Sequence, residues 1–297
     1  MKHTQHKTGI STACFYPMLL EDSFDLICDK LQYKTCELFV NTQSETEIKF
    51  LKDIKSKADD NGVKIASIHP HLSGLEPVLF LSEYKRRTYD SIKLYDMFFE
   101  AAQFLGADYV IFHGISTREL KMSIEEYADI FLMINNEAKK FGVEFLHENV
   151  ANINAHLKNL TSVNPDIKFT LDFKHSIAAG FDICDTIDAM GKNIAHVHLN
   201  DMMIENSTQT VSKTEMCRLP FYGNLDYTKI FKKLREINYN GSFITEVYRY
   251  NYKNDDEIKE SKKRVEDFLK SWESDVVRGI VLPAFEKSYA KYPTAKQ

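Results

Sequence analysis

The sequence has few cysteines and no long apolar run. Its five cysteines form no CxxC pair and no dense framework, which gives no support to a zinc ribbon and predicts reduced, mostly buried thiols in a cytoplasmic protein. The apolar runs are short and interrupted by charged residues, so no segment is expected to span a membrane. Residues 1–7 are polar and lead directly into a strand-like segment, which is not the pattern of a signal peptide.

An excess of positive charge and the usual nucleotide-binding motifs are also missing. The formal charge of the 297 residues is −5 at pH 7, and the lysine-rich stretch 253–270 holds six basic and six acidic residues. A nucleic-acid-binding protein usually has a basic face, so no nucleic acid partner is expected. Neither GxGxxG nor GxxxxGKS follows a strand-like segment, so a nucleotide-binding sheet lacks its usual motif.

The sequence does contain a regular alternation. Short segments rich in β-branched and apolar residues recur and are separated by amphipathic helical patterns. Four glycines, Gly62, Gly106, Gly142 and Gly241, stand one to three residues before a strand-like segment, where the C-cap of a helix is expected. The predicted strands are 8–14, 35–40, 64–69, 108–113, 143–148, 168–172, 194–199 and 242–247.

This alternation predicts a parallel sheet in an α/β protein. Eight repeats in one uninterrupted chain favour a closed (β/α)8 TIM barrel, with an open doubly wound sheet as the alternative. We predict a single domain over residues 1–297, in which about residues 273–297 form a C-terminal extension outside the barrel. One of the predicted helical stripes consists of Leu94, Met97, Phe98, Ala101, Ala102 and Leu105.

Residues that commonly bind metals stand at the C-terminal ends of six successive predicted strands. That end of a barrel carries the catalytic groups, and carboxylates and imidazoles crowded there need a cation between them. Nitrogen and oxygen ligands without thiolate suit Mn, Zn, Co, Fe or Mg, among which the sequence does not choose. The six residues are His69, His113, Glu148, Asp172, His198 and Glu246.

Two other histidines and the tryptophan are assigned structural roles. His147 is adjacent to Glu148, so strand alternation turns its side chain toward the helices. His196 shares a face with His198 but lies two residues deeper, in the core. Trp272 continues an apolar helical stripe and is expected to pack rather than to contact a ligand.

Three segments carry a resemblance to a known family. They are Glu148-Asn149 at the end of the fifth strand, the run LDFKHSIAAGFD at 171–182 and the run HLND at 198–201. With these segments, the chain from about residue 8 to residue 248 resembles the xylose isomerase-like superfamily. That superfamily groups sugar phosphate isomerases and epimerases with the endonuclease IV branch of DNA repair.

The resemblance implies a metal site and a substrate contact. In the epimerase branch the histidine of a D-x-x-H motif contacts the substrate, and that position here is His175. The endonuclease branch adds two histidines that match His69 and His113, so the chain is expected to bind one divalent ion and, with these residues, a second. The metal ligands of the epimerase branch correspond to Glu148, Asp172, His198 and Glu246.

Two departures from the family pattern bear on the substrate. Enzymes of the endonuclease IV type complete a third metal site with an Asp-x-His pair after the seventh strand, and the corresponding segment 213–218 has no histidine. The usual Gly-x-Gly before the last helix is replaced by Phe221-Tyr222-Gly223. The missing pair and the negative net charge argue against cleavage of abasic-site phosphodiesters.

Together these features predict a metal-dependent isomerase or epimerase that acts on a sugar or sugar phosphate through an enediolate. Glu148 and Glu246 would act as base and acid on opposite faces of the substrate carbon. A phosphodiesterase-like metal-dependent hydrolase, a lyase on a sugar-derived substrate and a binding barrel without activity are the alternatives, and a homo-oligomer is left open. The predicted substrate contacts are His175, His71, Asn149, Asp201, Arg218 and Arg249.

Overall fold

The computed structural model describes residues 7–114, 120, 122–204 and 217–278. In this part of the chain parallel strands close into a barrel in the order β1-β10-β7-β6-β5-β4-β3-β2, with β2 pairing again with β1. The predicted (β/α)8 barrel is thereby confirmed. The barrel strands are β1 (Thr8–Ser11), β2 (Thr35–Val40), β3 (Lys64–Pro70), β4 (Tyr109–Phe112), β5 (Glu144–Glu148), β6 (Lys168–Asp172), β7 (Ile194–Leu199) and β10 (Phe243–Thr245).

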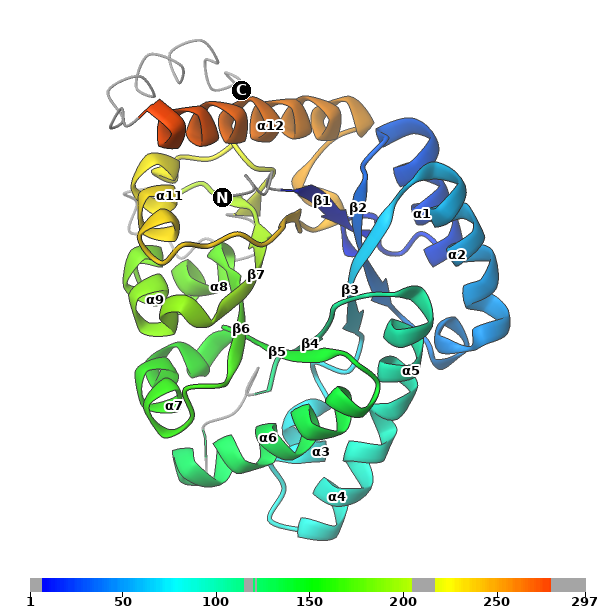
Figure 1. The fold of residues 1–297 in the computed structure, drawn as a ribbon, viewed down its shortest axis with the longest axis vertical. Helices are drawn as coiled ribbons and strands as arrows, with labels where there is room; N and C mark the ends of the chain where they lie inside the picture. The colour runs from blue at the N-terminus through cyan, green and yellow to red at the C-terminus, as the bar shows by residue number, and fades with distance from the viewer. Residues whose placement is uncertain (1–6, 115–119, 121, 205–216, 279–297) are drawn as a thin grey trace.

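Helices follow the strands and form a ring around them, with α12 lying next to α11 (Figure 1). A short antiparallel pair, β8 (Asp201–Met202) and β9 (Cys217–Arg218), lies outside the barrel sheet. The helices in the described part of the chain are α1 (Leu20–Leu26), α2 (Ile48–Asn61), α3 (Glu76–Phe80), α4 (Lys85–Leu94), α5 (Asp96–Leu105), α6 (Ile124–Lys140), α7 (Leu157–Val163), α8 (Phe173–Ala178), α9 (Ile183–Met190), α11 (Tyr227–Glu236) and α12 (Asp255–Arg278).

Helix α6 illustrates why these segments are helical. The Ser123 side chain caps its start by accepting a hydrogen bond from the backbone N–H of Glu126. Acidic residues in its first turn and Lys139 and Lys140 in its last turn complement the helix dipole. Its buried face packs on the barrel and consists of Tyr127, Ala128, Ile130, Phe131, Ile134, Asn135 and Ala138.

Several predicted strands differ from the observed ones by one or two residues at an end, and two predicted elements differ more. The first strand ends at Ser11 rather than at residue 14, because the Ser11 hydroxyl accepts a hydrogen bond from the backbone N–H of Ala13 and a 3-10 helix follows (Thr12–Phe15). The helical stripe predicted to begin at Leu94 is divided between two helices. Leu94 ends α4 and is 37% exposed, whereas Tyr95 between the helices is fully buried.

The glycine C-caps were predicted correctly at three positions out of four. Gly62, Gly106 and Gly142 adopt φ values of 61°, 70° and 74°, the left-handed conformation that ends a helix. After α11 that conformation is adopted by Asn238, with φ 57°, and Gly241 is not a cap. Gly241 instead lies so close to β7 that a Cβ atom there would be 2.6 Å from a backbone oxygen.

The C-terminal helix α12 lies beside α11 (Figure 1), and the packing role expected for Trp272 is confirmed. The Trp272 ring lies 5.3 Å from the Phe231 ring and nearly perpendicular to it. The extension expected from about residue 273 begins inside α12, and residues 279–297 lie outside the described residues, so this boundary stays a prediction. All five cysteines are buried without disulfides, and no helix among the described residues is long and apolar enough to cross a membrane.

Candidate metal centre

The C-terminal ends of the barrel strands border a cavity of about 650 Å³. This volume lies within the range of small-molecule sites. Its lining combines aromatic residues such as Phe39 and Tyr248 with titratable groups. The histidines, carboxylates and lysine that line it are His69, His71, His113, His175, Glu148, Glu246 and Lys174.

Four of the predicted ligands converge beside this cavity. The Nδ1 atom of His198 lies 2.7 Å from Glu148 Oε1, 3.4 Å from Glu246 Oε2 and 3.7 Å from Asp172 Oδ2. One ligand atom from each of the four residues falls within 4.8 Å of the others. They are brought together because Glu148 and Asp172 end β5 and β6, His198 is in β7 and Glu246 follows β10.

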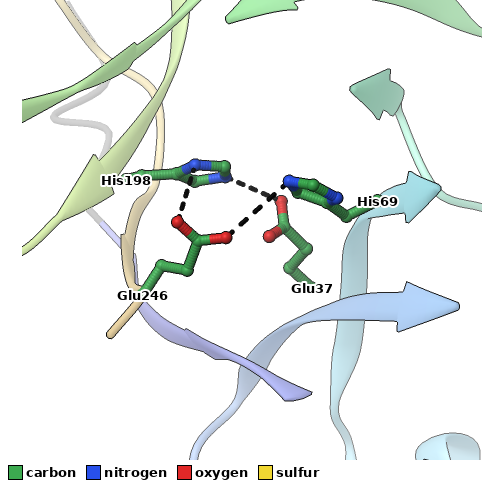
Figure 2. A group of neighbouring side chains, drawn as sticks. All are labelled: Glu37, His69, His198 and Glu246. Carbon is green, nitrogen blue, oxygen red and sulfur yellow. Dashed lines mark hydrogen bonds and ion pairs between the residues drawn. The ribbon is translucent and has the colours of Figure 1, made fainter. Parts of the chain in front are cut away.

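Glu37 on β2 is a further carboxylate in this group and was not predicted from the sequence. It is fully buried, and Figure 2 shows it linked to one nitrogen of the His198 ring, whereas Glu246 is linked to the other. Its Oε2 lies 3.1 Å from His198 Nε2 and 3.3 Å from His196 Nε2, and it accepts a hydrogen bond from the Ser67 hydroxyl. With its proton on Nε2, shared with Glu37, a neutral His198 would present Nδ1 to an ion, as in carboxylate–histidine–metal triads.

A second cluster is formed by the two histidines that match the endonuclease branch. The Nε2 atoms of His113 and His69 lie 3.2 Å and 3.9 Å from Glu148 Oε2. The chain around His113 is held by Glu76, whose buried carboxylate accepts hydrogen bonds from the backbone N–H groups of His113 and Gly114 at 2.8 Å and 2.6 Å. The structure therefore places all six predicted ligands in two clusters that share Glu148.

Charged neighbours lower the pKa values of two buried carboxylates in the cluster, Glu148 and Asp172. Burial alone would raise the pKa of Glu148, but the charge of His198 and its hydrogen bond, together with His113, hold this pKa well below its ordinary value. Burial likewise raises the pKa of Asp172, but the ammonium of Lys174, together with His175 and His198, more than reverses this shift. Buried anionic groups require compensation, so the cluster suits a cation.

Lys174 provides part of that compensation and was not singled out by the sequence analysis. Its ammonium forms ion pairs with both Asp172 and Glu246, although only 9% of the side chain is exposed. Burial lowers the pKa of Lys174, but these two carboxylates raise it well above the ordinary value for lysine. The ammonium therefore stays charged inside the site.

Two of the predicted substrate contacts line the cavity. His175 Nε2 lies 4.0 Å from Glu148 Oε1 and 3.9 Å from Asp172 Oδ2, and 21% of the side chain is exposed. His71 is held by a hydrogen bond between its Nδ1 and the backbone oxygen of Val40, 3.0 Å away. Both imidazoles are thus placed where a small molecule in the cavity would meet them.

The other four predicted contacts do not line this cavity. Asn149 is buried and donates hydrogen bonds to the backbone oxygen of Asp172 and to Ser176. Arg249 is exposed and stacks over the ring of Tyr252, whereas Arg218 donates to the adjacent backbone oxygen.

Asp201 is fully buried and supports the altered Gly-x-Gly segment. Its Oδ1 accepts hydrogen bonds from the backbone N–H groups of Met202 and Leu225, at 2.8 Å and 3.1 Å. A Cβ atom at Gly223 would lie 2.3 Å from the same oxygen, so glycine is required there. Phe221, at the position of the first glycine, still adopts a left-handed φ of 65°.

The structural roles expected for two histidines were predicted correctly. His147 is buried outside the cluster, 2.5 Å from the Tyr127 hydroxyl and stacked on Phe131. His196 is buried deeper in the barrel, between Glu37 and Tyr109.

A family model matches most of this chain. Residues 22–271 match the model described as the xylose isomerase-like TIM barrel. The chain belongs to the xylose isomerase-like TIM barrel family. The resemblance found in the sequence is therefore confirmed, whereas a comparison with curated protein sequences found no significant match.

Solved structures with the xylose isomerase-like barrel are similar along nearly their whole length. One is a D-tagatose 3-epimerase-like protein, at 21% identity, TM-score 0.68 and coverage of 91% of this chain and 99% of that chain. Another is D-psicose 3-epimerase with D-fructose, at 16% identity, TM-score 0.69 and coverage of 88% and 97%. A third is a probable 3-DHS dehydratase of Bacillus anthracis, at 15% identity, TM-score 0.66 and coverage of 87% and 98%. At these identities the similarity establishes the fold.

The residues of this xylose isomerase-like barrel fit a divalent ion. The Oε2 atom of Glu148 is buried and forms no hydrogen bond among the described residues, where its polar neighbours are the Nε2 atoms of His113 and His69. Such an oxygen is costly unless a cation approaches it. The neighbouring ligand atoms are imidazole nitrogens and carboxylate oxygens, a set that binds Mn, Zn, Co or Mg.

Signals for the two missed residues were present in the sequence. Glu37 is a carboxylate inside the apolar segment TCELFV, and a charged residue within a predicted buried strand needs a partner. It lies in the middle of its strand, however, whereas the predicted ligands stand at strand ends. Lys174 lies inside the run DFKH, where the aspartate and the histidine match the D-x-x-H motif and the lysine does not.

Proposed function

We propose that this protein is a metal-dependent isomerase or epimerase of a sugar or sugar phosphate. The observation that carries the proposal is the convergence of Glu148, Asp172, His198 and Glu246 within 4.8 Å, two of them lining a cavity of about 650 Å³. The similar barrels of a D-tagatose 3-epimerase-like protein and of D-psicose 3-epimerase support the same class of reaction.

The four converging residues would hold the ion, and Glu37 would orient His198 through the contact of its carboxylate with His198 Nε2. A divalent ion bound there supplies Lewis-acid polarisation of the substrate carbonyl, which acidifies the neighbouring C–H bond and stabilises an enediolate. The ion-binding residues come from three neighbouring strands and the residue after β10, so their positions are fixed by the sheet rather than by loops.

Glu148 and Glu246 would move the proton. One carboxylate removes it from the substrate carbon and the other returns it, and epimerisation needs these groups on two faces of the substrate. The two side chains flank His69, whose Nε2 lies 3.9 Å from Glu148 Oε2 and 3.7 Å from Glu246 Oε1. His175 and His71 line the same cavity and would hold substrate hydroxyl or carbonyl oxygens.

The proposal predicts exchange of a carbon-bound proton. When the protein, supplied with Mn²⁺, is incubated in deuterated water with a panel of ketoses and ketose phosphates, the product should carry deuterium at the isomerised carbon. Proton removal by a carboxylate that exchanges with solvent is the physical reason. NMR detects the label directly. If no member of the panel gains deuterium or changes configuration, the assignment to sugar isomerisation is wrong.

The second cluster favours a second candidate function, a metal-dependent hydrolase. His69, His113 and Glu148 would hold an ion next to the first one, and a pair of ions activates water for phosphodiester cleavage. A lyase is supported only by the similar barrel of the probable 3-DHS dehydratase. Cleavage of a phosphodiester such as bis(p-nitrophenyl) phosphate, without any C–H exchange in sugars, would favour the hydrolase.

His113→Ala is expected to remove one of two bound ions. The His113 imidazole lies within 4 Å of the carboxylates of Glu76 and Glu148, but it has no ion pair with Asp172 or Glu246. The ion held by Glu148, Asp172, His198 and Glu246 should therefore stay bound. Elemental analysis of protein equilibrated with Zn²⁺ would then give a stoichiometry near two for the unaltered protein and near one for the variant. A stoichiometry of one in both proteins would assign His69 and His113 to substrate contact or packing.

A further inference from the structure

The ammonium of Lys174 occupies the carboxylate oxygens that the proposed ion would need. It forms ion pairs with Asp172 Oδ2 and Glu246 Oε2. The other oxygen of Asp172, Oδ1, already accepts hydrogen bonds from the side-chain amide of Asn200 at 3.0 Å and from the backbone N–H of Lys174 at 2.8 Å. Oδ2 is therefore the Asp172 oxygen available for an ion, and Lys174 is bound to it.

The same two oxygens face the metal-binding nitrogen of His198. His198 Nδ1 lies 3.7 Å from Asp172 Oδ2 and 3.4 Å from Glu246 Oε2. An ion coordinated by this nitrogen and these oxygens would lie directly beside the ammonium of Lys174. Two cations that share the same pair of oxygens repel each other, and burial weakens the screening by water.

We propose that Lys174 is a built-in cation that competes with the divalent ion for Asp172 and Glu246. Without the ion, its ammonium neutralises the two carboxylates. Binding of the ion displaces the ammonium into the cavity, where it becomes a positively charged contact for substrate oxygens. This inference rests on the proposed metal site.

The structure provides a place for the displaced ammonium. Lys174 already lines the cavity, and its Nζ lies 5.9 Å from the centre of the Tyr248 ring, within cation–π range. Rotation of the lysine stem toward Tyr248 needs no movement of the barrel, because Lys174 is in the short helix α8 at the cavity edge.

The test compares Lys174→Met with the unaltered protein. Methionine is unbranched and only one atom shorter than lysine, and it removes the charge. The affinity for Mn²⁺ or Zn²⁺, measured by calorimetry with the metal alone, should therefore rise. Even at the dielectric constant of water, a unit charge about 4 Å from a divalent ion corresponds to more than a roughly tenfold change in Kd. Lys174→Arg keeps the charge and should not tighten binding. Lys64→Met removes an exposed lysine at the N-terminal end of β3, at the end of the barrel opposite the cavity, and should leave Kd unchanged.

A second measurement uses the unaltered protein and does not depend on the folding of a variant. Reductive methylation followed by mass spectrometry should label Lys174 severalfold faster with Zn²⁺ bound than without it, while labelling of Lys64 stays constant. Slower or equal labelling of Lys174 with Zn²⁺ overturns the displacement. Equal Kd values for the unaltered protein and Lys174→Met overturn the competition but leave the metal site standing, whereas no binding by either protein overturns both proposals.

Discussion

Replacing Glu246 by glutamine is expected to lower kcat for sugar isomerisation by about 10²–10⁴-fold, the usual cost of losing a general acid or base. The amide oxygen can still coordinate an ion, but the amide cannot accept and return a proton. The variant should therefore retain measurable affinity for Mn²⁺ while losing deuterium exchange. Steady-state kinetics and NMR in deuterated water, together with calorimetric titration of Mn²⁺, separate the two effects.

The matched control is Glu144→Gln. Glu144 is exposed at the start of β5, at the opposite end of the barrel from the cluster, so the same chemical change there should leave kcat and Kd unaltered. Normal turnover by Glu246→Gln would mean that the two-carboxylate mechanism is wrong. Loss of both the ion and the activity would show that Glu246 acts mainly as a ligand.

Asp172→Asn is expected to abolish loading of the four-residue site without unfolding α8. Asp172 Oδ1 caps this helix by accepting hydrogen bonds from the backbone N–H groups of Lys174 and His175, and an asparagine oxygen can keep that cap. The amide nitrogen would replace Oδ2, which faces His198, and it cannot coordinate. Altering a residue that only orients a ligand costs about 10–100-fold in metal affinity, so loss of the ligand itself should cost more.

Calorimetric Kd values and thermal unfolding of the metal-free protein test this expectation. Asp188→Asn makes the same change in α9, where the carboxylate forms an exposed ion pair with Lys233, and should not affect the affinity. An unchanged Kd for Asp172→Asn would remove this residue from the ligand set. A large fall in the unfolding temperature of the metal-free variant would show instead that the substitution damages the fold.

The site residues that stand at the C-terminal ends of barrel strands could be predicted from the sequence. In a barrel of parallel strands all C-terminal ends meet at one face, so a ligand-type residue at the end of a strand can be placed there without knowing the strand order. His69, Glu148 and Glu246 were found in this way, and the structure places all three at the cavity. The substrate contacts proposed at Asn149 and Asp201 stay predictions. In the structure their amide and carboxylate groups form hydrogen bonds with nearby backbone and side-chain groups.

The sequence by itself determined the barrel, because alternation along strands and the periodicity of helices are local patterns that each segment carries alone. Only the tertiary structure decided which side chains face each other across the barrel. Glu37 and His198 are 161 residues apart in the chain and meet because closure of the sheet brings the interior faces of β2 and β7 together. The direction of the Lys174 side chain was also decided by the tertiary structure. Its flexible four-carbon stem can point to solvent or to a buried carboxylate, and it points to Asp172 and Glu246 because the fold brings these two charges together beside it.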